Sequence, residues 1–121
     1  MDQQVLDALR NDRLIDITTI GRRSGAPSRK EMWFHNVDGV IYLTGRPGRR
    51  DWYANLLANP EFTFHLKQSA TADLRARAHP ITGEDEKRAV LAEILPRINR
   101  ADELDRWVAD SPLVRVEFVD E

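Results

Sequence analysis

The amino-acid sequence predicts a mainly β fold, in which about six mostly antiparallel strands curl into a small barrel with helices packed outside. Segments 61–67 and 72–79 alternate apolar with polar residues, as strands do when one face is buried. Asp38-Gly39, between two strand-like segments, is a strong hairpin signal. The segments are not spaced as repeated βαβ units, so the expected sheet is not a parallel one.

The expected elements follow from residue type and periodicity along the chain. They are a helix over 2–11, strands over 14–20, 29–37 and 40–44, a short helix over 51–59, strands over 61–67 and 72–79, a helix over 83–95, a helical run with Leu104, Trp107 and Val108, and a strand over 113–119. GRRSGAPS and GRPGRR are expected to be glycine-rich loops. We expect Asp51 to cap one helix, and Thr82 with Asp85 to form a capping box for the next.

Length and composition predict a single domain over residues 1–121. The chain has 121 residues, of which 41% are hydrophobic, enough for one core. No apolar stretch approaches the roughly 18 residues of a membrane span, and the N-terminus lacks a signal pattern. We therefore expect a cytoplasmic protein without a membrane span. The absence of cysteine excludes disulfides, thiol nucleophiles and cysteine-ligated zinc.

Charge is distributed unevenly along the chain, although the net charge is only −2. Residues 21–50 contain two acidic residues and a larger basic set, Arg22, Arg23, Arg29, Lys30, Arg46, Arg49 and Arg50. The final third of the chain is acidic and would repel an extended polyanion. We therefore expect one small anionic ligand at the cationic segment, and no nucleic-acid partner. The weaker alternative, a single-strand-binding barrel, predicts salt-sensitive binding.

The first glycine-rich loop, GRRSGAPSRK, lies between two expected strands. Its glycines allow the backbone to point N–H groups at an anion, while basic side chains and the hydroxyl of Ser24 add charge and donors. This combination is typical of a phosphate or polycarboxylate site. An ordinary solvated turn is an equally good explanation of the loop taken alone.

The second loop, GRPGRR, leads directly into the helix that begins near Asp51. Gly45 and Gly48 permit close approach of a ligand, and the helix N-terminus favours an anion. Taken alone, this segment is better explained as a hairpin end followed by a helix that covers the core. Two such loops at strand ends strengthen the case for a shared anion site.

The remaining side chains offer no catalytic or metal-binding pattern. His35, His65 and His79 lie in expected strands without metal-ligand spacing, and no serine has a triad arrangement. We expect these histidines to be exposed or hydrogen-bonded, and we expect no metal site. Trp52 and Tyr53 flank the second loop, and Trp33 follows the first. These aromatic rings beside basic loops suit a planar ligand with an anionic tail.

Two motifs together carry a resemblance to a known family. TIGRRSG at 19–25 and WYANLLANP at 52–60 resemble the hallmarks of the deazaflavin-dependent nitroreductases, which have a split β-barrel of the flavin-nucleotide-binding type. The resemblance covers residues 14–67 well, and the rest of the chain only by its pattern of elements. It implies a split barrel with peripheral helices, of α+β character.

The resemblance also implies a reaction and a set of site residues. The reaction is hydride transfer from reduced coenzyme F-420, an 8-hydroxy-5-deazaflavin, to a quinone, nitroaromatic or other activated double bond, without a dedicated catalytic acid or base. The implied cofactor-binding residues are Arg22, Arg23 and Ser24 at the phosphate, Ser28, Arg29, Lys30 and Glu31 beside the deazaflavin, Thr44, Gly45 and Arg46 in the second loop, and Trp52, Tyr53 and Asn55 closing the pocket.

Alternatives stay open at this point. Split barrels of this kind also bind flavin mononucleotide (FMN), haem or other tetrapyrroles, and some bind a cofactor without turnover, as carriers or sensors. Small split barrels also pair into homodimers. Trp107 either covers exposed sheet in such a homodimer or packs inward.

Overall fold

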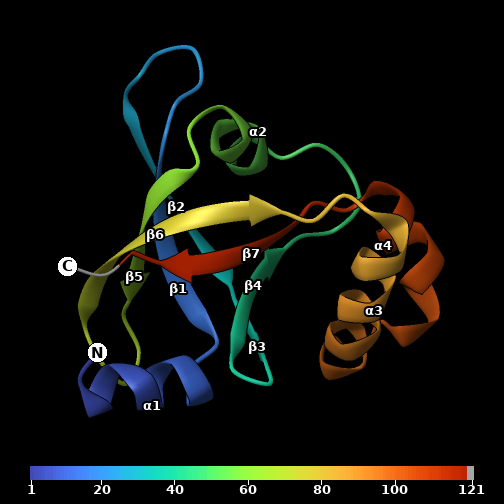
Figure 1. Ribbon diagram of the computed structural model, residues 1–121, viewed down its shortest axis with the longest axis horizontal. Coiled ribbons are helices and arrows are strands. Elements are labelled where there is room, and N and C mark those ends of the chain that lie inside the picture. Colours follow the sequence, from blue (N-terminus) through green and yellow to red (C-terminus); the bar gives the residue numbers. More distant parts are fainter. Residues whose placement is uncertain (120–121) are drawn as a thin grey trace.

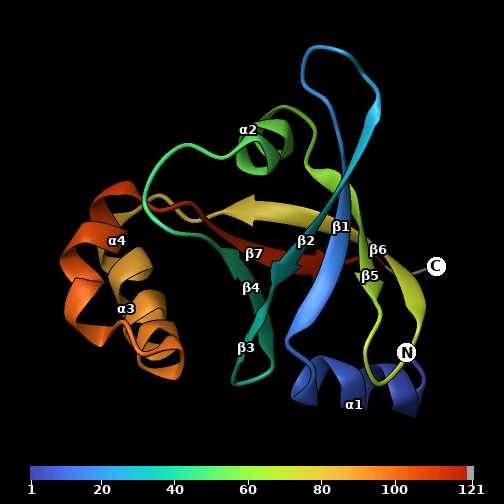
Figure 2. The same ribbon diagram turned by 180° about the vertical axis from the view of Figure 1, so that it is seen from behind.

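The computed structural model describes residues 1–119 and contains one curled sheet of seven antiparallel strands (Figure 1). Neighbouring strands pair in the order β2-β1-β5-β6-β7-β4-β3. Helix α1 lies across one end of the barrel, α2 lies near the other end, and α3 and α4 pack together at one side (Figure 2). The mainly β, antiparallel prediction is confirmed.

The observed elements match most of the expected segments. The strands are β1 (Leu14–Ile20), β2 (Pro27–Trp33), β3 (His35–Val37), β4 (Val40–Thr44), β5 (Glu61–Leu66), β6 (Ala72–Pro80) and β7 (Leu113–Phe118). The helices are α1 (Gln3–Asn11), α2 (Asp51–Ala58), α3 (Glu84–Ile94) and α4 (Leu104–Asp110), with 3-10 turns at Leu95–Ile98 and Ala101–Glu103. Within the described residues no helix has the length and apolar character to cross a bilayer.

Phe34 divides the segment that the sequence predicts as one strand over 29–37. Its backbone N–H leaves the sheet and donates to the carbonyl of Arg13 at 2.9 Å. Its ring is 2% exposed and packs edge-on against Phe64, with 5.4 Å between ring centroids. The expected count of about six strands was therefore one short. Since β2 and β3 are the two edges of the sheet, the edges meet at this residue.

Two apolar clusters form the core. The first fills the barrel and includes Ile15, Ile17 and Phe64, which point inward from the alternating strands β1 and β5. The second lies between the sheet and the α3–α4 pair and includes Leu91 and Trp107. Trp107 is 2% exposed, so it packs inward rather than covering an exposed face.

Two predicted helix caps are wrong. Helix α3 has Gly83 as its N-cap and no side-chain cap, so Thr82 and Asp85 form no capping box. Helix α2 has Arg50 as its N-cap, and Asp51 is the first helical residue. In both helices acidic side chains sit in the first turn, where they interact favourably with the helix dipole without a capping hydrogen bond.

Two of the three histidines in the sheet, His65 and His79, are hydrogen-bonded as expected, whereas the half-buried His35 on β3 makes no side-chain hydrogen bond among the described residues. His65 is buried on β5, with its Nδ1 2.7 Å from the carboxylate of Asp73 and its Nε2 2.7 Å from the hydroxyl of Thr18. His79 contacts Glu117 at 2.7 Å. Among residues 1–119 no group of three or more metal-ligating side chains comes together.

The stability of the fold should depend on pH through His35, on β3. Burial chiefly, with the charges of Arg97 and Arg13, lowers the pKa of its imidazole from 6.5 to about 4. Between these two values the unfolded chain binds a proton that the folded chain does not, so the free energy of unfolding falls as the pH drops through this window. The His35 contribution to that fall is about 2–3 kcal/mol.

Urea unfolding near pH 7 and near pH 4.5 measures this effect. We expect His35→Gln to show a pH dependence smaller than that of the wild type by about 2–3 kcal/mol. Parallel pH profiles for the two proteins would remove His35 as a source of the effect.

Candidate functional site

Two basic loops project from the same end of the barrel, one on each side of α2. The first is the β1–β2 hairpin loop, residues 21–26, and the second is the β4–α2 loop, residues 45–50. Both views show the hairpin extending beyond the barrel beside α2, while the second loop runs toward α4 (Figures 1 and 2). Helix α2 therefore separates the two loops that the sequence analysis expects to share a site.

The hairpin loop is closed by its own hydrogen bonds. Gly21 N–H donates to the carbonyl of Ala26 at 2.8 Å, and Ala26 N–H donates to the hydroxyl of Ser24 at 3.1 Å. A side chain at Gly21 would place its Cβ 2.5 Å from that hydroxyl. Gly25 has a φ of 72°, a conformation that favours glycine. The glycines of this motif are thus required by the tight turn itself.

Asn55 of α2 fastens the hairpin to the helix. Its amide oxygen accepts from the backbone N–H of Arg22 at 3.1 Å and from the Arg22 guanidinium at 2.9 Å. Its amide nitrogen donates to Thr19 Oγ1 at 3.2 Å. The Arg22 guanidinium also contacts Asp51 at 3.3 Å. Arg22 therefore has internal partners, and its first role is structural.

A cavity of about 300 Å³ lies between the hairpin loop and α2, and we call it the hairpin cavity. It brings together five of the predicted site residues, Arg22, Arg23, Ser24, Ser28 and Asn55. Arg23 is exposed and, among the described residues, has no hydrogen-bond or ion-pair partner. Its guanidinium is the one in this cavity that is available to a ligand.

The predicted residues on β2 divide between two faces of the strand. In the antiparallel register, Ser28 pairs with Thr19 and Lys30 with Ile17, both of which point into the barrel. Arg29 and Glu31 pair with Thr18 and Asp16 on the outer face. Ser28 and Lys30 thus share the inner face with Met32, which packs against the core.

Arg29 and Glu31 belong to an ion-pair network on the outer face. Arg29 contacts Asp16 at 2.9 Å, Lys67 contacts Asp16 at 2.7 Å, and Lys67 also pairs with Glu31. Hydrogen bonds from Lys67 and then Arg29 lower the pKa of the Asp16 carboxyl. Strand alternation thus turns Arg29 and Glu31 away from Ser28 and Lys30, and a role of these two residues in cofactor binding stays a prediction.

Side-chain hydrogen bonds from Thr44 and Arg50 hold the backbone of the second loop in place. Thr44 is buried and donates from its hydroxyl to the carbonyl of Pro112 at 2.6 Å. The Arg50 guanidinium donates to the carbonyls of Arg46 and Arg49 at 2.9 and 2.8 Å. A Cβ atom at Gly45 would lie 3.5 Å from the Arg50 side chain and 3.9 Å from the Trp52 ring, which are ordinary van der Waals distances.

The two predicted aromatic residues of α2 have different positions. Trp52 is 4% exposed and belongs to the barrel core, so it lines neither the hairpin cavity nor the larger one described next. Tyr53 is half-buried, and burial raises the pKa of its phenol. Of the two, Tyr53 lines the larger cavity, on the opposite side of α2 from the hairpin.

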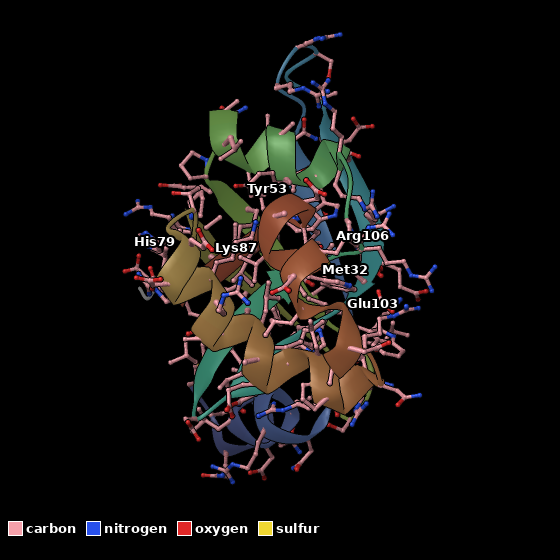
Figure 3. The ribbon with its side chains drawn as sticks, turned by 90° about the vertical axis from the view of Figure 1, so that its right-hand side faces the viewer. Met32, Tyr53, His79, Lys87, Glu103 and Arg106 are labelled. Atoms are coloured by element: carbon pink, nitrogen blue, oxygen red, sulfur yellow. The ribbon has the colours of Figure 1, made fainter. Side chains whose placement is uncertain are left out.

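That second cavity, of about 480 Å³, lies between the second loop, α2 and the α3–α4 pair, and we call it the basic pocket. Figure 3 shows Tyr53, Lys87 and Arg106, which line it from α2, α3 and α4. Sequence reasoning missed Lys87, Arg106 and Ser111. No local signal marks them, because they lie in the acidic third of the chain.

Comparison with known proteins identifies the family. The model of the F420H(2)-dependent quinone reductase family matches residues 3–117, which is nearly the whole chain. The chain belongs to this family. It is therefore an oxidoreductase that uses coenzyme F-420, and the predicted deazaflavin cofactor is confirmed. No curated protein sequence matches the chain.

Solved structures of low sequence identity share the fold of this family member. A conserved hypothetical protein from Mycobacterium tuberculosis has a TM-score of 0.76 and 20% identity over 99% of this chain and 82% of that chain. A putative pyridoxamine 5'-phosphate oxidase from Listeria innocua has a TM-score of 0.70 and 11% identity, covering 96% and 91%. A structure described as an F420 reductase has 0.64 and 20%, covering 94% and 92%. The split-barrel prediction is confirmed.

Replacing Asn55 should loosen the attachment of the hairpin loop to α2. We expect Asn55→Ala to lower the free energy of unfolding by about 2–3 kcal/mol, because it removes the acceptor of the Arg22 backbone N–H and the donor to the buried hydroxyl oxygen of Thr19. Urea unfolding measures the loss, and hydrogen exchange at residues 21–26 should accelerate.

Asn59→Ala is the matched control, since the Asn59 amide makes one bond, 3.4 Å long, to the carbonyl of Ile20. We expect it to cost less than about 1 kcal/mol. Equal losses for the two variants would contradict a special role of Asn55.

Proposed function

We propose that the chain transfers a hydride from reduced coenzyme F-420 to a small organic acceptor, such as a quinone, nitroaromatic or activated double bond, with the cofactor held by the hairpin cavity and the inner face of β2. The family match supports the chemistry. The observation that supports the location is the meeting of Arg23, Ser24 and Ser28 in one cavity beside α2. The bound deazaflavin supplies the hydride chemistry.

The donor set of this region suits a phosphate-bearing cofactor. Arg23 and Lys30 are exposed and lack carboxylate partners among the described residues, so their charge is available. Ser24 and Ser28 add hydroxyl groups, and the hairpin turn adds backbone N–H groups. In this proposal the chain binds and orients the cofactor, and none of its side chains serves as a dedicated acid or base.

Association of two copies stays a prediction. Trp107, the residue considered for a homodimer interface, packs inward and is therefore not exposed to contact a second copy. Gel filtration with light scattering measures the mass directly.

Titration with oxidised coenzyme F-420 tests the cofactor assignment and its location. We expect micromolar-range binding to the wild type, and a loss of about 1–3 kcal/mol in binding free energy for Arg23→Gln and for Lys30→Gln, since each removes a charge-assisted contact. Arg29→Gln is the matched control, because its side chain lies on the opposite face of β2.

Binding of FMN without binding of coenzyme F-420 would overturn the cofactor assignment. Equal affinity of all three variants and the wild type would remove Arg23 and Lys30 from the site. Turnover is followed by the absorbance of the reduced cofactor with 1,2-naphthoquinone as acceptor. Binding without acceptor-dependent oxidation would instead indicate a cofactor carrier.

A further inference from the structure

The basic pocket concentrates positive charge from parts of the chain that are distant in sequence. Arg49 and Arg50 come from the second loop, Lys87 from α3 and Arg106 from α4. Asp110 is the single acidic residue in the lining. The pocket therefore has a clear excess of positive charge, to which Lys87 and Arg106 contribute from the acidic final third of the chain.

Within residues 1–119, none of these four cations forms an ion pair, although the charge of Asp110 acts on Lys87 and that of Glu103 acts on Arg106 at longer range. None of them has an acidic group at ion-pair distance, although other arginines, such as Arg88 with Asp105, do. The bonds from Arg50 go to backbone carbonyls, which orient the guanidinium but leave its charge uncompensated. Lys87 is partly desolvated, and burial lowers the pKa of its ammonium group. An anionic ligand would compensate the unpaired positive charges and would favour the charged form of Lys87.

Ser111 supplies the second, independent observation. The residue lines the basic pocket and is 3% exposed, and its hydroxyl is the one buried side-chain polar atom of the described residues without a hydrogen-bond partner. A buried hydroxyl without a partner costs free energy, and native structures rarely retain one without a reason. An oxygen atom of a bound anion would accept its hydrogen bond.

Size and shape fit a small planar molecule with one anionic group. The volume of about 480 Å³ falls within the range of small-molecule sites. The ring of Tyr53 forms an aromatic wall. The first turn of α2 has no side-chain cap, so its N–H groups add to the field that favours an anion. The basic pocket shares no lining residue with the hairpin cavity.

We propose that the basic pocket binds the electron acceptor through an anionic oxyacid group held by Lys87, Arg106 and Ser111. Hydride transfer then requires the deazaflavin ring to extend from the hairpin cavity along β2 until it contacts the acceptor. The identification of the ligand as the electron acceptor rests on the proposed function, whereas the existence of an anion site in this pocket does not. The overall reaction balances for a quinone, which receives two electrons and one proton as hydride from the reduced cofactor and a second proton from water. The anionic tail of the cofactor is the competing occupant, because it would present the same kind of anionic group to the pocket.

Binding of two matched probes to the chain without cofactor tests the anion site. Isothermal calorimetry compares 1,2-naphthoquinone-4-sulfonate with neutral 1,2-naphthoquinone. We expect the sulfonate to bind the wild type more tightly by about tenfold, and Lys87→Gln, Arg106→Gln and Ser111→Ala each to remove most of that preference. Arg10→Gln, which removes one charge on α1 at the other end of the barrel, should retain it.

Stability separates binding from packing. Ser111→Ala removes a hydroxyl that has no partner, so its urea midpoint should equal or exceed that of the wild type while sulfonate binding weakens. Equal binding of the two probes, or variants that keep the wild-type preference, would overturn the proposal.

Two further measurements distinguish the sources of the anion. The same three variants should keep the wild-type affinity for oxidised coenzyme F-420 and raise KM for the sulfonated quinone by about tenfold, with KM for the neutral quinone unchanged. Loss of cofactor affinity equal to the loss for the sulfonate would assign the pocket to the cofactor tail and overturn the acceptor assignment. Selective sulfonate binding without any turnover would leave the anion site standing and reject the proposed reaction.

Discussion

The buried amide of Asn55 is the contact on which the end of the barrel with both glycine-rich loops depends. It satisfies the backbone and side chain of Arg22 and the hydroxyl of Thr19 at once, so it ties the end of β1 and the hairpin loop to α2. Helix α2 in turn forms a wall of both cavities, through Asp51 and Asn55 on one side and Arg50 and Tyr53 on the other. A shift of this helix would change both cavities together.

Electrostatics in this protein depend on which cations already have partners. Arg22 and Arg29 lie in the cationic segment but contact Asn55, Asp51 and Asp16, so much of their donor capacity is used within the fold. Arg23 has no such partner, and the guanidinium of Arg50 meets only carbonyls. The free charges, rather than the total, define where an anion can bind. The net charge of −2 conceals this distribution.

Local pattern predicted much of the fold, and its errors have local causes. The alternation of β5 and β6 and the Asp38-Gly39 turn, where Asp38 has a φ of 52° and Gly39 a φ of 88°, follow from the chemistry of neighbouring residues. The expected capping box at Thr82 failed because a cap requires side-chain geometry that residue type does not guarantee. The division at Phe34 depends on a distant carbonyl, that of Arg13, and on the ring of Phe64.

The sequence by itself determined the antiparallel β class, the two glycine-rich loops and, through the motifs at 19–25 and 52–60, the family. Only the tertiary structure decided which face of β2 is the inner one, because the pairing with β1 and the burial of Ile17 set the direction of Lys30 against that of Arg29. Only the fold brings Lys87, Arg106 and Ser111 to the second loop, since each comes from a helix or helix end that reads as surface in isolation. A site built from distant segments has no local signature, because its chemistry arises from packing rather than from neighbours in the chain.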